Sequence, residues 1–437
     1  MEKTRISKEY SLNILFIFFL ILSSAHKACA THSTYDKFSK GYFLIHSTGR
    51  FKFDLKRIIN KKESVFILFT SEKGLKSLKK EEKEAFSLIL SEKAITFLTL
   101  RNNYEKAHRL LPKLSLPSLN IITHDEYSMA LAAKLRDYYG MEPSYNVISK
   151  FTDKFIMKES LSNTEIKIPK YIRFDQNHYL YDTNYLRSII DYLGLPIFAK
   201  KIMGTCSEGS QKINSLPELK RWAQNKKTQE EYELDEFLDG TVFHCDSLIS
   251  DGKIIFTLVS RYASPPHLYQ KGEPLGSILL PMSAEITKRL VAYNEEVLKS
   301  LKETPNGMTH LEVFRRPNNE LFFLEIAARS AGAAVPEAYE VFLRDNIQEL
   351  HYRSQMGLPI QLNQEKGPYS AWVWFPITKE GPIAKFNIPL IKSKYTLKWH
   401  YKQGELLSKK DITKDRIGEI ILYNESHQQL EKDFHYL

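Results

Sequence analysis

The chain has 437 residues, of which 43% are hydrophobic and 12% aromatic, and its formal net charge is +10. This composition excludes a disordered protein, and the length suits two or three domains rather than one small core. The lysines and arginines are dispersed, which favours a solvated basic surface; a basic nucleic-acid-binding protein is kept as the second alternative.

The first 30 residues have the layout of a secretory signal peptide. Lys3 and Arg5 lie in a basic start, the run 14–22 is apolar, and Ala28-Cys29-Ala30 supplies a small-x-small site. The apolar run is too short for a stable membrane span. We therefore expect residues 1–30 to be a signal peptide or hydrophobic leader, and they are left out of the fold prediction.

Short apolar runs alternate with helix-compatible stretches over residues 41–140. The predicted buried strands are 42–45, 65–69, 94–98 and 119–122, and the predicted helices are 79–91, 103–111 and 125–139. Alternation of this kind is typical of a parallel sheet. We therefore predict a small open α/β domain over 41–140, and it carries no G-x-G-x-x-G dinucleotide motif.

The pattern changes in the rest of the chain, which is predicted to be α+β. Helices are expected at 149–161, 179–192, 283–302, 336–342 and 345–356, and strands at 171–174, 196–202, 230–237, 241–250, 253–261, 308–315 and 320–327. The later strands follow one another closely, which indicates antiparallel pairing. We predict one domain over 145–360 and a small β-rich domain over 365–437, with β-like runs at 369–375 and 419–423.

Two acidic residues lie in neighbouring strands of a predicted hairpin. The segments around Glu312 and Glu325 alternate with period two, and the turn residues 316–319 separate them. If Asn318-Asn319 forms the tip, the two glutamates face each other with Cβ atoms about 4.5–5.5 Å apart. Such carboxylates repel unless a cation lies between them, and Mg²⁺ prefers oxygen ligands of this kind. A three-residue turn would break this pairing, and two glutamates on a solvated sheet face are the alternative.

Positive charges and glycines precede this hairpin. The apolar strand 196–199 ends in Lys200-Lys201, and the segment from Gly204 to Ser210 follows it directly. Glycines let a backbone close over phosphates, and a lysine adds a point charge for them. Lys154 could reach the same phosphates from the preceding helix. A plain hairpin turn at 204–210 and an exposed helix lysine are the alternatives.

A third segment is acidic and partly apolar. Asp235-Glu236-Phe237-Leu238 ends a predicted strand, and Asp239-Gly240 signals a turn. Extended backbone here could pair with an adenine edge while Phe237 or Leu238 packs on the ring. A charged strand end is the alternative.

In this order and spacing, the segments over 41–437 resemble the ATP-grasp superfamily, and more closely its carboxylate–amine ligases of the L-amino-acid-ligase and carnosine-synthase kind. The resemblance implies an N-terminal α/β domain, a nucleotide-clamping domain with a lid at about 196–240, and a small C-terminal domain. The residues implied in nucleotide binding are Lys154, Lys200, Gly204, Ser207, Gly209, Asp235, Glu236, Phe237 and Leu238. Glu312 and Glu325 are the implied metal ligands, and Arg329 and Lys200 the implied catalytic cations.

Three positions depart from the pattern of that superfamily. Many members have asparagine two residues after the second metal acid, where this chain has Ala327, although some amino-acid-ligase relatives also carry a small residue there. Many have a ribose-binding acid at the position of Val242, and Lys201 replaces a common proline. These departures leave open a second reading, a catalytically silent ATP-binding regulatory protein of the same fold.

The resemblance implies an ATP-dependent ligase that forms an amide or peptide bond through an acyl phosphate. Its implied cofactors are ATP and Mg²⁺, with Mn²⁺ as a substitute, and its implied substrates are a carboxylate and an amine, amino acids above all. Neither nucleic acid nor a stable membrane span is expected, and a homodimer is left open. Use of ATP points to the cytoplasm, whereas residues 1–30 point to export or membrane association.

Overall fold

The computed structural model describes residue 35 and residues 38–47, 50–226, 230–387, 390–408 and 415–437. The predicted leader over residues 1–30 lies outside this range. The chain divides into two compact units: the first holds the described residues up to Arg50 together with Asp54–Thr123, and the second holds Phe51–Phe53 and His124–Leu437.

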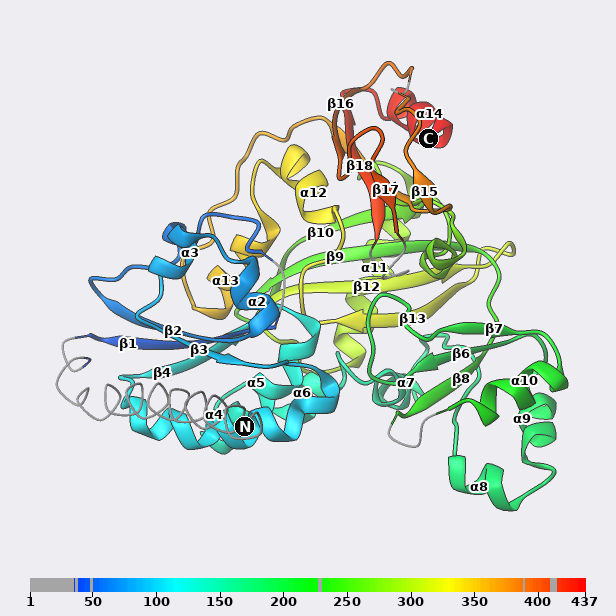
Figure 1. Ribbon diagram of the computed structural model, residues 1–437, viewed down its shortest axis with the longest axis horizontal. Coiled ribbons are helices and arrows are strands. Elements are labelled where there is room, and N and C mark those ends of the chain that lie inside the picture. Colours follow the sequence, from blue (N-terminus) through cyan, green and yellow to red (C-terminus); the bar gives the residue numbers. More distant parts are fainter. Residues whose placement is uncertain (1–34, 36–37, 48–49, 227–229, 388–389, 409–414) are drawn as a thin grey trace, which may run out of the picture. The chain divides into compact units, whose positions relative to one another are not determined.

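The first unit contains a four-stranded parallel sheet, which confirms the predicted fold class (Figure 1). Its strand order is β3-β2-β1-β4, with β1 at Lys40–His46, β2 at Ser64–Ser71, β3 at Leu88–Glu92 and β4 at Leu119–Thr123. The helices are α2 (Glu72–Ser77), α3 (Lys80–Glu84) and α4 (Leu100–Leu114), with short 3-10 turns at Leu55–Arg57 and Phe97–Thr99. All eight residues of β2 are buried, as expected for a central strand of a parallel sheet.

The third strand of this sheet was predicted in the wrong place. The run 94–98 is not a strand; β3 lies at Leu88–Glu92 and overlaps the end of the predicted helix 79–91. Ile95 is buried but Leu98 is 70% exposed, so the run contributes little to the core. Thr96 accepts a hydrogen bond from the backbone N–H of Thr99, and this cap begins the turn that leads into α4.

An eight-stranded antiparallel sheet forms the centre of the second unit (Figure 1). Its strand order is β13-β12-β9-β10-β11-β14-β18-β16. The strands are β9 (Thr241–Ser250), β10 (Lys253–Tyr262), β11 (Leu275–Leu279), β12 (Gly307–Arg315), β13 (Leu321–Ala327), β14 (Tyr369–Pro376), β16 (Lys394–Trp399) and β18 (Arg416–Asn424). The predicted strands from 241 to 327 are confirmed within one or two residues.

Helices cover this sheet on both faces because apolar residues occupy alternate positions of its strands. Phe243 and Leu311 belong to a core that also includes residues of α5, α6, α7 and α11. Val242 and Met308 belong to a second core, with residues of α12 and α13. The helices are α5 (Glu126–Tyr138), α6 (Tyr145–Ser149), α7 (Lys154–Leu161), α11 (Glu285–Ser300), α12 (Val335–Leu343) and α13 (Ile347–Gln355).

A smaller antiparallel sheet is formed by β5 (Tyr171–Arg173), β8 (Tyr232–Glu236), β6 (Ile197–Lys201) and β7 (Gln211–Ile213), in that order. It is accompanied by α8 (Gln176–Tyr181), α9 (Tyr185–Leu193) and α10 (Leu216–Gln224). The predicted helix 179–192 is two helices here, and the predicted helix 149–161 begins later, at Lys154. Asp153 sets this start, because its carboxylate caps α7 by accepting from the N–H groups of Phe155 and Ile156.

The predicted β-like runs 369–375 and 419–423 are strands, and the C-terminal strands continue the central sheet in antiparallel pairing. β14 pairs with β11, β18 pairs with β14, and β16 pairs with β18. A two-stranded ribbon of β15 (Gly381–Pro382) and β17 (Leu406–Leu407) and the helix α14 (His427–Tyr436) complete this region. The sequence analysis did not predict α14. Within the described part of the chain, no helix has the length and apolar character needed to cross a membrane.

Candidate functional site

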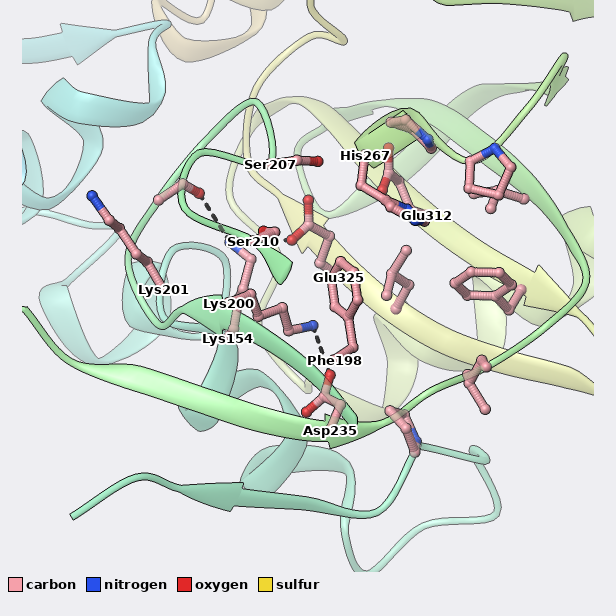
Figure 2. A pocket seen from close by; sticks show the side chains of 18 of the residues that line it. Lys154, Phe198, Lys200, Lys201, Ser207, Ser210, Asp235, His267, Glu312 and Glu325 are labelled. Carbon is pink, nitrogen blue, oxygen red and sulfur yellow. Dashed lines mark hydrogen bonds and ion pairs between the residues drawn. The ribbon is translucent and has the colours of Figure 1, made fainter. Parts of the chain in front are cut away.

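A pocket lies between the small sheet and the edge of the central sheet, within the second unit (Figure 2). Its lining comes from β6, β8, β12, β13, the loop between β6 and β7, and the 3-10 segment Pro266–Lys271. The predicted site residues that line it are Lys154, Lys200, Gly204, Ser207, Asp235, Glu236, Phe237, Leu238, Glu312 and Glu325. Gly209 and Arg329 are not among the lining residues.

The two predicted metal acids pair directly across the hairpin. Glu312 of β12 lies opposite Glu325 of β13, which confirms the predicted pairing. The predicted two-residue turn is wrong, however: Arg315 pairs with Leu321, and the N–H of Arg316 donates to the carbonyl oxygen of Glu320 at 2.9 Å.

A β-bulge reconciles this longer turn with the glutamate pairing. Val313 pairs with Phe323 and Glu312 with Glu325, so Leu324 is an extra residue in β13. Successive residues of a regular strand point to opposite faces. At the bulge, Leu324 and Glu325 both line the pocket. The bulge therefore supplies the pocket with an apolar side chain and a carboxylate from consecutive positions.

Each glutamate has a polar partner from another element. The Tyr262 hydroxyl donates to Oε1 of Glu312 at 2.9 Å, and Nε2 of His310 lies 3.5 Å from the same oxygen. Nζ of Lys154 lies 3.1 Å from Oε2 of Glu325. Burial opposes ionisation of Glu325, but Lys154 and Lys200 outweigh it and hold the pKa of this carboxyl below its ordinary value. Tyr262 of β10 is thus a direct neighbour of the acid pair.

The loop between β6 and β7 folds over one end of the pocket. Nζ of Lys154 donates to the carbonyl oxygen of Gly204 at 2.9 Å, and Nε2 of Gln270 donates to that of Ser207 at 2.6 Å. Cys206 and Ser207 both have positive φ, at 57° and 53°, a conformation that costs non-glycine residues of order 1 kcal/mol each. The loop is therefore held by contacts near its start, at Gly204, and in its middle, at Ser207. Gly209, also at positive φ, lies in this loop but does not line the pocket.

The opposite end of the pocket is mainly apolar. Phe198 of β6 packs edge-on against His267, with ring centroids 5.1 Å apart, and both line the pocket together with Phe237. Burial lowers the pKa of His267 to about 4, and the positive charges of Lys271 and Lys212 reinforce this effect. A flat apolar ligand group such as a nucleobase suits this wall. The sequence analysis singled out neither Phe198 nor His267, because both are ordinary apolar or aromatic positions when read along the chain.

Four buried charges stand beside this wall. Lys158 of α7 and Lys200 of β6 both contact Asp235 and Glu233 of β8. Neither Lys158 nor Glu233 is among the predicted site residues, although a signal existed: Lys158 is four residues from Lys154 on one helix, and Glu233 is two residues from Asp235 on one strand.

Arg329 lies in the segment that follows β13, outside the pocket lining. Its Nε donates to Oε2 of Glu126 at 2.5 Å, and its NH1 group donates to the carbonyl oxygen of Ser330 at 2.9 Å. Burial disfavours the charged guanidinium, but Glu126 outweighs this effect and raises the pKa of Arg329. Glu126, at the start of α5, was also missed, because it lies about 200 residues away in the sequence.

A second buried cluster adjoins Glu312. Asp246 accepts hydrogen bonds from Nδ1 of His244 at 2.6 Å, from Nδ1 of His310 at 2.7 Å and from the Tyr339 hydroxyl at 2.7 Å. These are hydrogen-bond distances, whereas two ligands of one metal ion lie about 3 Å or more apart when each bond is about 2.0–2.2 Å. In this structure the cluster is held together by hydrogen bonds.

Comparison with known proteins finds one curated relative and many structures of similar fold. No family model matches the sequence. Over 232 residues, 51% of this chain, it is 25% identical to an L-arginine-specific L-amino acid ligase of Bacillus subtilis; the match covers 54% of that protein, so the chain spans about half the length of this curated relative.

Solved structures share the fold over most of the chain. The crystal structure of an L-amino acid ligase from Bacillus licheniformis superposes with a TM-score of 0.66 at 13% identity, covering 91% of this chain and 96% of that one. The biotin carboxylase domain of the Hydrogenobacter thermophilus 2-oxoglutarate carboxylase, solved with the magnesium salt of ADP, gives a TM-score of 0.60 at 13% identity, covering 88% of this chain and 86% of that one. With a parallel N-terminal sheet followed by these antiparallel sheets, the chain has the ATP-grasp fold that these structures share.

Proposed function

We propose that this protein is an ATP-dependent carboxylate–amine ligase that joins amino acids or similar small molecules through an acyl phosphate. The observation that carries the proposal is the opposed pair Glu312 and Glu325, with Lys154 and Lys200 beside it in one pocket. The amino-acid ligases among its relatives favour amino acids as substrates.

The donor set fits a hard divalent cation. Two carboxylates meet across adjacent strands, and Mg²⁺ is bound by carboxylates together with phosphate oxygens and water. Glu312 and Glu325 would hold Mg²⁺, or Mn²⁺ in its place, and the ion would neutralise phosphate charge on ATP. One oxygen of Glu312 is already occupied by Tyr262, which fixes the direction of its carboxylate.

The remaining groups suit binding and charge neutralisation. Phe198, Phe237 and His267 form an apolar wall for the base, while Lys154 and Lys200 lie nearer the acid pair and would hold the phosphates. A phosphoryl transfer requires positioning and electrostatic stabilisation more than a covalent nucleophile on the protein. The loop 204–210 would exclude water from the intermediate.

The reaction then proceeds in two balanced steps. A substrate carboxylate oxygen attacks the γ-phosphorus, and the bond to the ADP leaving oxygen breaks. The amine of the second substrate attacks the acyl carbon, phosphate leaves, and the nitrogen gives up its proton. Arg329 is assigned to stabilising the negative charge that develops on the acyl oxygen or the departing phosphate.

Glu312→Gln and Glu325→Gln test the acid pair. Each change removes a charge without removing volume, and each is expected to lower Mg²⁺-dependent ADP formation at least about a hundredfold. The measurement is ADP and phosphate release with ATP, Mg²⁺ and pooled amino acids and small carboxylates.

Glu320→Gln is the matched control, because Glu320 precedes β13 in the same hairpin and its ion pair with Lys167 is partly exposed and outside the pocket. It is expected to retain activity. If Mg²⁺-dependent ADP formation persists in both pocket variants, the metal assignment is wrong. If the unsubstituted protein binds ATP but releases no ADP with any substrate pool, it is a silent nucleotide-binding protein.

A further inference from the structure

Lys158 and Glu233 form an ion pair that is fully removed from solvent. Nζ of Lys158 lies 2.5 Å from Oε1 of Glu233 and 2.6 Å from Oδ1 of Asp235, and the exposed fractions of the Lys158 and Glu233 side chains are 0%. Neither residue lines the pocket. Burying charges is expensive, so an ion pair in this position requires a reason beyond stability.

The pair is joined to a second one that does line the pocket. Nζ of Lys200 lies 2.9 Å from Oδ2 of Asp235 and 3.5 Å from Oε1 of Glu233. Figure 2 shows Lys200 directed at Asp235 on the floor of the pocket. The four groups therefore carry two positive and two negative charges in alternation, with Lys158 and Glu233 behind Lys200 and Asp235.

Lys200 has two roles in this arrangement: it neutralises carboxylates of β8, and in the proposed function it binds the phosphates of the nucleotide. Asp235 and Glu233 together offer two negative charges, and without Lys158 they would be balanced by Lys200 alone. Lys200 would then be held at β8, and the set would carry one net negative charge beside the pocket. A negative charge in a buried site repels a polyphosphate strongly, because little solvent screens it.

We infer that Lys158 is a positioning residue that supplies the counter-charge for Glu233 and so leaves Lys200 available to the phosphates of the bound nucleotide. The inference rests on the proposed nucleotide site and adds a residue outside the pocket lining to it. Burial works against both charges of the Lys158–Glu233 pair, because it lowers the pKa of Lys158 and raises that of Glu233. At Lys200 and Asp235 the attraction between opposite charges outweighs burial, which raises the pKa of Lys200 and lowers that of Asp235.

The test compares Lys158→Met with the double variant Lys158→Met/Glu233→Gln. The single change leaves one positive and two negative charges, whereas the double variant again has one of each. Crucially, the double variant restores charge balance without restoring any hydrogen bond of Lys158 to Asp235. A purely structural role of Lys158 therefore predicts no recovery.

The measurement is the Kd of adenosine, AMP, ADP and ATP for the full chain at pH 8, by titration calorimetry, with thermal melting to verify folding. Lys158→Met is expected to weaken ATP binding about tenfold or more, to weaken ADP and AMP binding progressively less, and to change adenosine binding by less than about threefold. The double variant is expected to recover most of the ATP affinity. Lys167→Met removes the same charge from an exposed ion pair and is expected to have no effect.

If Lys158→Met does not fold, Glu233→Gln replaces it in the comparison. This variant differs from the double variant only at Lys158. It is expected to bind ATP at least as tightly as the double variant does, and the difference in affinity between the two variants is expected to become smaller from ATP through ADP and AMP to adenosine. Two results would overturn the inference: an equal loss of affinity for adenosine and for ATP in Lys158→Met, or a double variant that binds ATP as weakly as Lys158→Met does. Failure of the unsubstituted protein to bind any nucleotide would instead overturn the proposed function itself.

Discussion

Glu312 illustrates how single residues fix the geometry of the pocket. Its Oε1 atom accepts from Tyr262, and His310 lies beside the same oxygen while bonding to Asp246. Burial disfavours a charged imidazole, but Asp246 outweighs it and raises the pKa of His310 to about 9. One carboxylate oxygen of Glu312 is thus held by the protein interior, which restricts the orientation of the other.

His267 gives a pH dependence whose sign follows from its burial. Its pKa is about 4 in the folded protein, below the value of about 6.5 for an unfolded histidine. Between pH 6.5 and 4 the unfolded chain therefore binds a proton that the folded chain does not, so stability falls as the pH falls. Replacing His267 with Gln is expected to reduce this loss by about 1 kcal/mol, after allowance for partial exposure to solvent.

Denaturant unfolding at pH 7.5 and 4.5 measures this effect. A His267→Gln protein with an unchanged difference between the two pH values would show that His267 is not held neutral by its surroundings.

At the scale of elements, the hairpin of β12 and β13 depends on a feature that its sequence pattern hides. The residues 316–319 predicted a turn, and the alternation predicted two strands; both are present. The turn is one residue longer than predicted, and the bulge at Leu324 compensates for it. In so short a strand, a bulge leaves the alternation of apolar and polar residues almost intact. The pairing of the two glutamates could therefore be predicted from the sequence, but the longer turn and the bulge that together produce it could not.

Gly240 fixes the connection between β8 and β9 at the edge of the pocket. Its φ is +151°, and a Cβ atom there would lie 2.3 Å from the carbonyl oxygen of Arg315. Gly240→Ala must therefore displace backbone next to Leu238, and it is expected to cost about 2 kcal/mol or more of stability and to weaken nucleotide binding.

Gly252→Ala is the matched control, because its φ is also positive, at +72°, but no atom lies within 4 Å of the added Cβ. It is expected to cost about 1 kcal/mol from backbone strain alone, with nucleotide affinity unchanged. Chemical denaturation and nucleotide titration of both variants separate the two effects. Equal stability and equal affinity of the two proteins would contradict a close backbone approach at Gly240.

For the whole molecule, the local sequence pattern was sufficient to predict the fold class, but it was not sufficient to predict which distant segments pair with each other. Strand and helix alternation predicted the parallel sheet of the first unit, and closely spaced strands predicted the antiparallel sheets of the second. The run 94–98 was mistaken for a strand because a short apolar run can also occupy a loop and a 3-10 turn. The pairing of β11 with β14, which joins the C-terminal strands to the central sheet, joins segments about 95 residues apart and leaves no local signal.

In the candidate site too, local features could be predicted from the sequence and long-range partners could not. Glycines, terminal lysines and opposed acids are recognisable along the chain, and most of them line one pocket. Lys158 and Glu126 act through partners that lie about 75 and 200 residues away. Their charges could be read from the sequence, but which carboxylate or guanidinium each one meets is decided by the fold.

The central claim is that Glu312 and Glu325 together hold a divalent ion against the phosphates of a nucleotide. The most direct test is a crystal structure of the protein with Mn²⁺ and a non-hydrolysable ATP analogue, with the ion located by its anomalous scattering. We expect one anomalous peak at about 2.2 Å from a carboxylate oxygen of each glutamate and from a phosphate oxygen. A nucleotide bound elsewhere, or an ion that touches neither carboxylate, would contradict the account.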